Sequence, residues 1–148
     1  MNTHLQTQFD KLHTAVTEAI LKLTEIRARL DQKNLSPEAH SEALELLHSR
    51  YARLTDLYTY PVLDLLFRVL QEPHLPFVDR CHRLKKLGLI DYAKTLYDIK
   101  EIRTTMLTEY VNLDFSKMQL DILKVTPTLL QVSEHTLRYI QQMLTDLK

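Results

Sequence analysis

Apolar residues recur at intervals of three and four positions along most of the chain, the spacing that places them on one side of an α-helix. The first stripe predicts a helix of about 28 residues, with Leu5, Phe9, Leu12, Val16, Ala19, Ile20, Leu23, Ile26 and Leu30 facing inward. Ser36 then offers a side chain preferred at a helix N-cap, and Pro37 suits the first helical position. A second helix is therefore expected from Pro37, with an inward stripe of Leu44, Leu47, Tyr51, Leu54 and Leu57 or Tyr58.

Prolines shape the segment that follows. Pro61 has no N–H to donate to the carbonyl of Leu57, so we expect the second helix to kink or split there. The stripe resumes after Pro61, and Pro73 and Pro76 end it before a short helix at about residues 77–87. We expect the kinked helix to be packed by Tyr51, Tyr58 and Tyr60, and the short helix to face inward with Phe77, Cys81 and Leu84.

Capping residues predict the remaining boundaries. Gly88, the only glycine, lies where a left-handed C-terminal cap belongs, and Asp91 can cap a helix that runs to about Val111. Asp114 can cap a last helix from Phe115 onward. That helix should bend at Pro127 and face inward with Met118, Ile122, Val125, Leu129, Val132, Ile140, Met143, Leu144 and Leu147.

The fold class follows from these elements. Long helices joined by short connections pack best as an antiparallel up-and-down bundle. A composition with 45% apolar residues and one glycine supplies a core but too few turn formers for an all-β fold. We expect an all-α bundle of four long helices plus a short extra helix, with residues 1–148 forming one domain.

Charge and composition limit the partners. Nineteen basic residues balance nineteen acidic ones, so the chain as a whole is not drawn to nucleic acid or to anionic membranes. No apolar run approaches the length needed to cross a bilayer, and the first residues do not resemble a secretory signal. Cys81, the single cysteine, excludes an internal disulfide. We therefore expect a cytoplasmic protein without a membrane partner.

One segment carries candidate chemistry. Arg103 and Tyr110 are seven residues apart and therefore nearly in line on a helix that also bears Ile99, Ile102, Met106 and Leu107 on one side. The segment 84–110 resembles the HepT-like toxins of the HEPN group, which pair with a small MNT-type nucleotidyltransferase antitoxin and share the motif Arg-x4-His-x-Tyr. The residues that carry the resemblance are Leu87-Gly88-Leu89-Ile90, Asp91, Asp98, Lys100-Glu101-Ile102-Arg103 and Glu109-Tyr110. Two positions depart from the motif, because Thr104 replaces the usual Asn and Thr108 replaces the His.

The resemblance implies ribonuclease chemistry for proteins with the intact motif, and weak or absent activity for this chain. Motif-bearing proteins are ribonucleases in which the RNA 2′-hydroxyl attacks, an arginine holds the phosphate and a histidine takes the proton. Arg103 keeps its role, but the Thr108 hydroxyl cannot accept a proton near neutral pH, which should cost on the order of 10² to 10⁴ in rate. The resemblance also implies a site at a homodimer interface and AMP modification of Tyr110 by the nucleotidyltransferase. It implies no cofactor.

Each of these residues also has a purely structural interpretation. The Arg103 stem can lie across the core with its guanidinium paired to Asp98 or Glu101. Tyr110 can be a half-buried core tyrosine. The basic cluster of Arg80, Arg83, Lys85 and Lys86 could contact RNA phosphates, but cations near a helix C-terminus also complement the helix dipole.

Metal chemistry is not expected. Glu45-x-x-His48 and Asp79-x-x-His82 imitate parts of a di-iron signature, but the further glutamates that it requires are not evident.

Three functions remain open. The first is a HepT-like protein of weak or absent ribonuclease activity that dimerises and binds a nucleotidyltransferase. The second is an active ribonuclease whose base is another histidine, such as His82 or His135. The third is a noncatalytic scaffolding or dimerisation bundle, which predicts that Arg103 lies buried in a private ion pair and that no cleft opens beside Tyr110. The sequence thus leaves enzymatic activity open and favours its absence.

Overall fold

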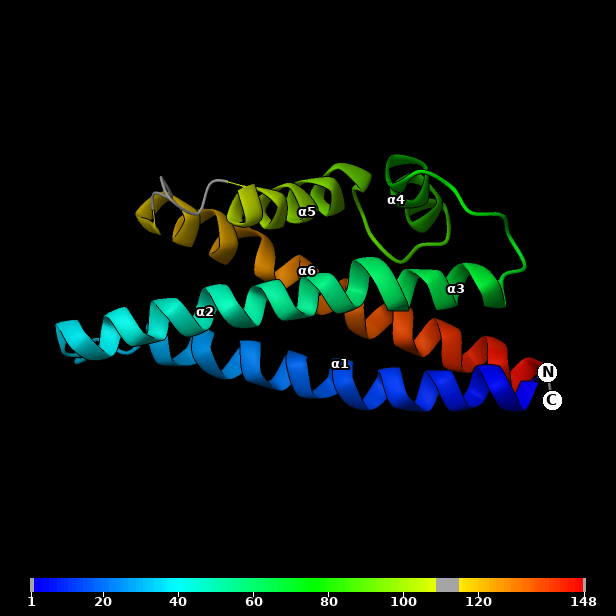
Figure 1. The fold of residues 1–148 in the computed structure, drawn as a ribbon, viewed down its shortest axis with the longest axis horizontal. Helices are drawn as coiled ribbons and strands as arrows, with labels where there is room; N and C mark the ends of the chain where they lie inside the picture. The colour runs from blue at the N-terminus through cyan, green and yellow to red at the C-terminus, as the bar shows by residue number, and fades with distance from the viewer. Residues whose placement is uncertain (1, 109–114, 148) are drawn as a thin grey trace.

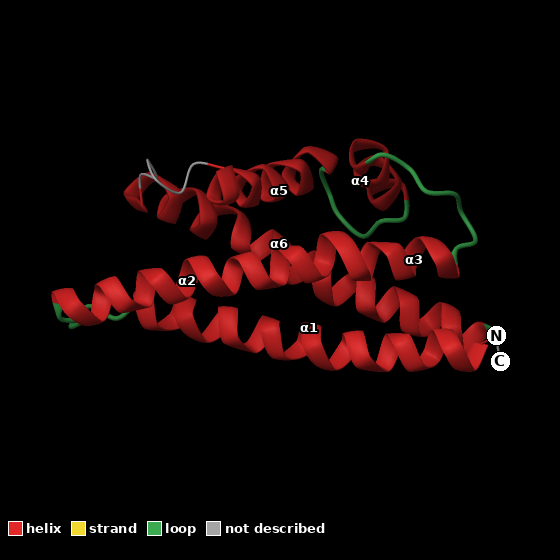
Figure 2. Ribbon diagram, in the orientation of Figure 1, coloured by secondary structure: helices red, strands yellow, loops and turns green. Residues whose placement is uncertain are grey.

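The computed structural model describes residues 2–108 and 115–147, and this part of the chain contains helices and no strand (Figure 1, Figure 2). The helices are α1 (Asn2–Leu30), α2 (Pro37–Leu57), η1 (Tyr58–Val62), α3 (Leu63–Val69), α4 (Phe77–Lys86), α5 (Ala93–Thr108) and α6 (Phe115–Asp146). The predicted all-α class is confirmed, and the helix boundaries lie close to those expected from the apolar spacing.

The helices alternate in direction as an up-and-down bundle (Figure 1). α1 runs antiparallel to the rod formed by α2, η1 and α3, α5 returns in the direction of α1, and α6 runs back to the end where the N-terminus lies. The rod contacts α1 and α6 along its length, and α2 also contacts α5. The first part of α6 lies beside α5 and its last part beside α1, and the short α4 packs against α5.

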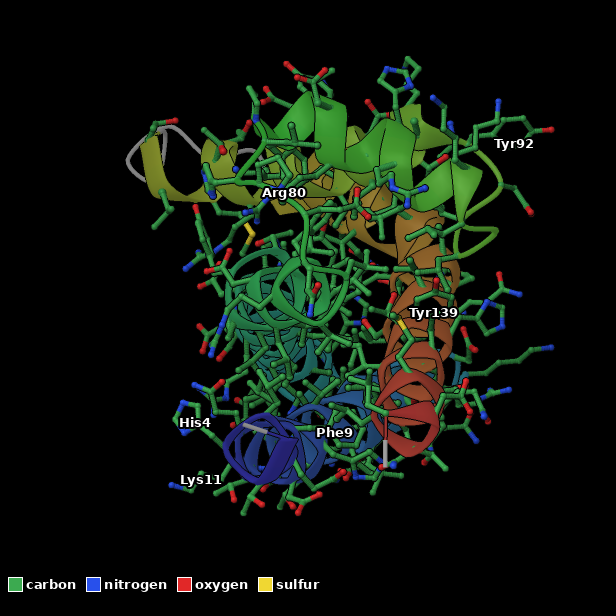
Figure 3. All side chains as sticks on the ribbon, turned by 90° about the vertical axis from the view of Figure 1, so that its right-hand side faces the viewer. His4, Phe9, Lys11, Arg80, Tyr92 and Tyr139 are labelled. Atoms are coloured by element: carbon green, nitrogen blue, oxygen red, sulfur yellow. The ribbon has the colours of Figure 1, made fainter. Side chains whose placement is uncertain are left out.

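The core follows the predicted stripes. Its largest fully buried side chains are Tyr51, Tyr58, Leu23, Ile26, Leu47, Leu54, Leu63, Leu66, Leu84, Leu96, Ile99 and Ile122. Figure 3 shows Phe9 turned toward the space between α1 and α6. Three expected inward residues are instead exposed: Tyr60 at 55%, Leu107 at 60% and Leu147 at 46%. Spacing alone places them at the edge of an apolar stripe, and among the described residues they are not covered by a neighbouring helix.

Pro37, Pro61 and Pro127 lie at the start of a helix or inside one. The Ser36 side chain accepts a hydrogen bond from the Ala39 N–H at 3.1 Å, which confirms the cap ahead of Pro37. Pro61 does not break the second helix; it lies in the π-helical turn η1, where the N–H of Leu63 reaches back five residues to the carbonyl of Tyr58. Pro127 lies inside α6, and Figure 1 shows this helix changing direction between its two parts.

Two left-handed residues end helices in the same way. Gly88 has φ +77°, its N–H donates to Lys85 O at 3.0 Å, and the N–H of Leu89 donates to Leu84 O at 3.0 Å. This pattern is a Schellman motif and confirms the predicted cap. Gln71 closes α3 in the same geometry, with φ 56° and a Glu72 N–H bond to Phe67 O at 3.0 Å, although it carries a Cβ.

The cap predicted at Asp91 is wrong in position. α5 begins at Ala93, and Asp91 lies two residues before it with an exposed side chain. Within the described residues Asp91 makes no hydrogen bond to the first turn of α5. The start of α6 at Phe115 agrees with the prediction, and the proposed cap at Asp114 lies outside the described residues.

Two buried tyrosine hydroxyls join the rod to other helices. The Tyr51 hydroxyl donates to the carbonyl of Ile99 in α5 at 2.7 Å, and the Tyr58 hydroxyl lies 2.8 Å from the hydroxyl of Thr136 in α6. Burial raises the pKa of both phenols far above the ordinary value, so they stay protonated and remain donors.

A Tyr58→Phe substitution tests the link to α6. It removes the hydroxyl and leaves buried Thr136 without this partner, so we expect the free energy of unfolding to fall by about 1–3 kcal/mol. Urea unfolding followed by circular dichroism measures the change. Tyr97→Phe, at a side chain that is 43% exposed, is the matched control and should change stability by less than about 0.5 kcal/mol. Equal effects of the two substitutions would contradict this role of the Tyr58 hydroxyl.

The two left-handed caps predict changes of opposite sign. Gly88→Ala places a Cβ at positive φ, where no other atom lies within 4 Å, so backbone strain alone should destabilise the protein by about 1 kcal/mol. Gln71→Gly relieves the same strain and should stabilise it by a similar amount. Thermal unfolding of both variants compares them, and destabilisation by Gln71→Gly would refute the conformational argument.

Candidate functional site: the groove between α2 and α5

Arg103 leaves α5 and reaches across to α2. Its Nε and Nη2 donate to the two carboxylate oxygens of Asp56 at 3.0 and 2.9 Å. The Arg103 side chain is 22% exposed and that of Asp56 is 43% exposed. The partner is therefore neither Asp98, which pairs with Lys94 at 3.0 Å, nor Glu101. A sequence separation of 47 residues hid this pair from any argument based on helical spacing.

A groove opens beside this ion pair. It has a volume of about 560 Å³ and is lined by Ser49, Ala52, Arg53, Asp56, Leu57, Tyr60, Pro61 and Arg103. Arg103 is thus ion-paired, as the scaffolding hypothesis predicts. Its side chain is also partly open to solvent, which that hypothesis does not predict. No histidine is among the lining residues.

Thr108 does not join Arg103 at this groove. Its hydroxyl donates to the carbonyl of Thr104 in its own helix at 3.0 Å, and the side chain is exposed. Five positions separate the two residues, which turns them about 140° apart around a regular helix. Within one chain, therefore, the Arg103 guanidinium and the Thr108 hydroxyl do not lie together at one site.

Tyr110, the residue expected to share a face with Arg103 and to be open to AMP modification, lies outside the described residues. Neighbouring Leu107, predicted to share the inward stripe with Ile99, is exposed. Ile102 and Met106 pack against the core instead. The inward face of α5 is therefore narrower at its C-terminal end than the spacing predicted.

The structure does not place Arg80 where it could contact RNA. Arg80 is 6% exposed, and Figure 3 shows it within the end of the bundle, whereas Tyr92 projects outward. It donates to Asp64 at 2.9 Å and to His74 Nδ1 at 2.7 Å, and its guanidinium lies 5.1 Å from the centre of the Phe67 ring. These contacts attach α4 to α3 and leave the cation inaccessible to a phosphate.

Arg83 is also ion-paired within the chain, although its side chain is partly exposed. Its Nε and Nη2 donate to the two oxygens of Glu72 at 2.8 and 2.9 Å, so this pair fastens the loop before α4. Hydrogen bonds from Arg83 hold the pKa of Glu72 below its usual range. Only Lys85 and Lys86 of the predicted RNA-binding cluster are exposed, at the C-terminal end of α4 where they also complement the helix dipole.

The histidines considered as substitute bases lie elsewhere. His135 lines a hollow of about 200 Å³ with Gly88, Asp91 and Tyr92, and His82 is exposed on α4. Among the described residues, no group of three or more His, Cys, Asp or Glu side chains is placed to hold a metal ion. Burial raises the pKa of the Cys81 thiol to about 11, which disfavours a role as nucleophile.

Sequence reasoning missed Arg53, Asp56 and Tyr60. Together with Ser49 they follow one another at intervals of four, three and four residues, so they share one face of the rod. That spacing was available in the sequence, but only the position of α5 makes this face one wall of a groove.

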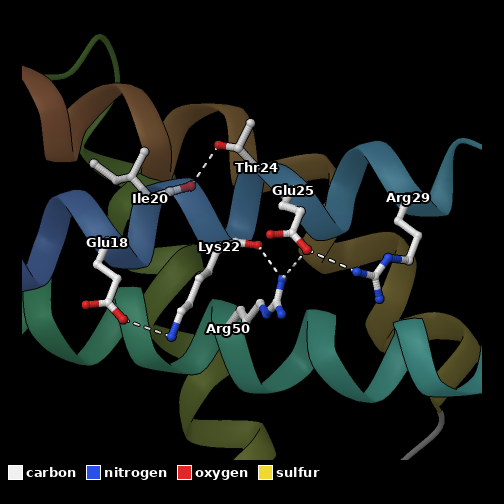
Figure 4. Close-up of polar contacts among 7 residues, drawn as sticks. All are labelled: Glu18, Ile20, Lys22, Thr24, Glu25, Arg29 and Arg50. Atoms are coloured by element: carbon white, nitrogen blue, oxygen red, sulfur yellow. Dashed lines mark hydrogen bonds and ion pairs between the residues drawn. The ribbon is translucent and has the colours of Figure 1, made fainter.

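A second, smaller hollow of about 270 Å³ borders the other side of α2, toward α1, and shares Ser49 and Arg53 with the first. Figure 4 shows how its charges are paired. Lys22 binds Glu18 at 2.8 Å, and Arg50 donates to the carbonyl of Lys22 at 2.8 Å. The hydrogen bond from Lys22 and the nearby charge of Arg53 hold the pKa of the Glu18 carboxyl below its usual range.

The Glu72–Arg83 pair predicts a pH-dependent contribution to stability. Because the folded-state pKa of Glu72 is lowered, the contribution is present above the unfolded-state value of about 4.3 and is lost as pH falls through the folded-state value. For this partly exposed pair, Glu72→Gln should cost about 1 kcal/mol or less at about pH 7, and this cost should shrink as pH falls through the folded-state pKa of Glu72. Urea unfolding at a series of pH values measures the difference, with exposed Glu42→Gln as the control; a constant cost across the series would contradict it.

No helix in the described part of the chain combines the length and the apolar character needed to cross a membrane. Comparison of the chain with protein-family models, with curated proteins and with solved structures finds no match in any of the three. The resemblance to HepT-like toxins therefore rests on the residues of segment 84–110 alone.

Proposed function

We propose that this chain is a cytoplasmic, HepT-like protein that forms a homodimer, binds a nucleotidyltransferase partner and has weak or no ribonuclease activity. The observation that carries the proposal is the state of the two motif positions on α5. Arg103 lies at an open groove, whereas Thr108 supplies only a hydroxyl that already donates to its own helix. The motif thus keeps its cation and lacks its proton acceptor.

The Arg103–Asp56 ion pair supports low catalytic activity independently. A phosphate at Arg103 must displace a carboxylate that holds the guanidinium through two hydrogen bonds. Part of the binding energy of a substrate would be spent on breaking this pair. A second subunit could supply a histidine, but the groove of the single chain contains none among its lining residues.

A scaffolding or dimerisation bundle without catalytic activity is the second candidate function. It is favoured by the same ion pair, because a bidentate arginine–carboxylate contact between α2 and α5 has a sufficient structural role of its own. The two candidate functions predict different results when histidine replaces Thr108. The HepT-like protein should gain RNA cleavage, and the scaffolding bundle should not.

Thr108→His is the decisive substitution. If this is a HepT-like protein that has lost its base, the variant should cleave single-stranded RNA about 10²- to 10⁴-fold faster than the native protein, which should show little or no cleavage. A labelled RNA incubated with each protein and resolved on a denaturing gel measures the rates.

Two controls sharpen the comparison. Thr108→Asn changes the side chain without adding a base and should remain at the native rate, and Arg103→Gln in the Thr108→His background should remove the gained activity. Equal cleavage by the native protein and Thr108→His would refute the account of the missing base. Absence of cleavage by both, with both proteins folded, would favour the scaffolding function.

A further inference from the structure

The hollow between α1 and α2 is lined by more cations than carboxylates. Lys22, Arg50 and Arg53 border it, and Glu18 is the one carboxylate among its described lining residues. The two helices that carry these side chains pack against each other along their length (Figure 1). Because the chain as a whole has no net charge, the excess of positive charge at this hollow is a local feature of the fold.

Each carboxylate near the hollow is shared by two cations. Glu18 binds Lys22 at 2.8 Å and also interacts with the charge of Arg53. Glu25, which binds a second arginine of α1 at 3.0 Å, lies 3.7 Å from Arg50 (Figure 4). Two carboxylates thus face four cations in this described cluster. The cations are paired, but their combined charge is only half balanced.

The guanidinium groups are positioned before any ligand arrives. The Nη1 of Arg50 donates to the backbone carbonyl of Lys22 at 2.8 Å, and the Arg50 side chain is only 20% exposed. Arg53 lies three positions further along α2, on the same helix face, and is exposed. Ser49 adds a hydroxyl to the lining. Donors that are already held on packed helices lose little entropy when a ligand binds.

A compact anion that carries more than one charge suits these donors. A phosphoryl group has a charge of about −1.5 to −2 near neutral pH and three acceptor oxygens. Guanidinium groups bind such oxygens through two parallel hydrogen bonds. The charge matters because the ligand must compete with Glu18 for Lys22 and Arg53. The volume of about 270 Å³ lies below the range of about 300–1,000 Å³ typical of pockets for drug-sized molecules, so a small ligand fits.

We propose that the hollow between α1 and α2 binds a small phosphoryl anion, with Lys22, Arg50 and Arg53 as its donors. The site goes beyond the proposed function, because it lies on the α1 side of α2 and uses neither Arg103 nor Thr108. Inorganic phosphate and a small phosphomonoester share this chemistry, and each can supply the ligand. The bound anion balances the charge that the glutamates leave unbalanced and reduces the mutual repulsion of the cations.

The test measures binding of inorganic phosphate and of glycerol phosphate, each alone, to the full chain. Phosphorus NMR of the ligand during a titration gives the dissociation constant, with the ionic strength held constant by sodium chloride. Arg53→Gln removes a charged donor and should weaken binding by roughly 10- to 100-fold. Glu18→Gln removes the carboxylate that competes for Lys22 and Arg53, so it should tighten binding by about 2- to 5-fold.

Matched variants separate this site from the effect of net charge. Arg138→Gln and Glu134→Gln change the charge of the whole chain by the same amounts as the two test substitutions. They alter a pair 3.5 Å apart on α6, and neither residue lines the hollow between α1 and α2. Neither control should change the affinity for phosphate or for glycerol phosphate. Circular dichroism checks that every variant is folded.

The outcomes decide between the sources and against the site. Binding of inorganic phosphate that Arg53→Gln weakens identifies the free anion as a ligand, and Arg53-dependent binding of glycerol phosphate alone identifies a phosphomonoester. Absence of binding to both ligands, equal losses in Arg53→Gln and Arg138→Gln, or weaker binding in Glu18→Gln would overturn the proposal. RNA cleavage by Thr108→His is a separate readout, so failure here leaves the test of the proposed function unaffected.

Discussion

The structure depends on how the chain accommodates Pro61 in the middle of its central rod. Proline cannot donate the hydrogen bond that an α-helix requires at that position, and a break there would separate α2 from α3. The chain instead forms the wider turn η1 and continues as one rod. Because α1, α5 and α6 all contact this rod, its continuity sets the positions of the other long helices.

The same rod holds both the core and the candidate site. On its inner side, the hydroxyls of Tyr51 and Tyr58 are bound to α5 and α6, and buried hydroxyls of this kind favour one arrangement because the alternatives leave them unpaired. On its outer side, Asp56 fixes Arg103 and thereby sets the edge of the groove against α5.

Local pairing explains why a basic cluster in the sequence is not a basic surface in the fold. Arg80 is bound to Asp64 and His74, and Arg83 is bound to Glu72. These partners precede the arginines by no more than 16 positions and lie in α3 or the loop after it. Of the four cations in the cluster, Lys85 and Lys86 remain exposed, at the C-terminal end of α4. Whether a cation can meet a ligand is thus decided by its neighbours in space and not by the charge of its segment.

The sequence by itself determined the helices, the caps at Ser36 and Gly88 and most of the core. Ser36, Gly88 and Pro61 act through local backbone chemistry, and the apolar stripes act through the helical period, so each could be predicted from residues close in the chain. Spacing could not decide which edge residues of a stripe are covered, as Tyr60 and Leu107 show, because coverage depends on how far the adjacent helix extends. Tertiary structure alone paired Arg103 with Asp56 and formed the groove beside Tyr60. Two residues that are 47 positions apart come into contact only when α2 and α5 pack together in the bundle.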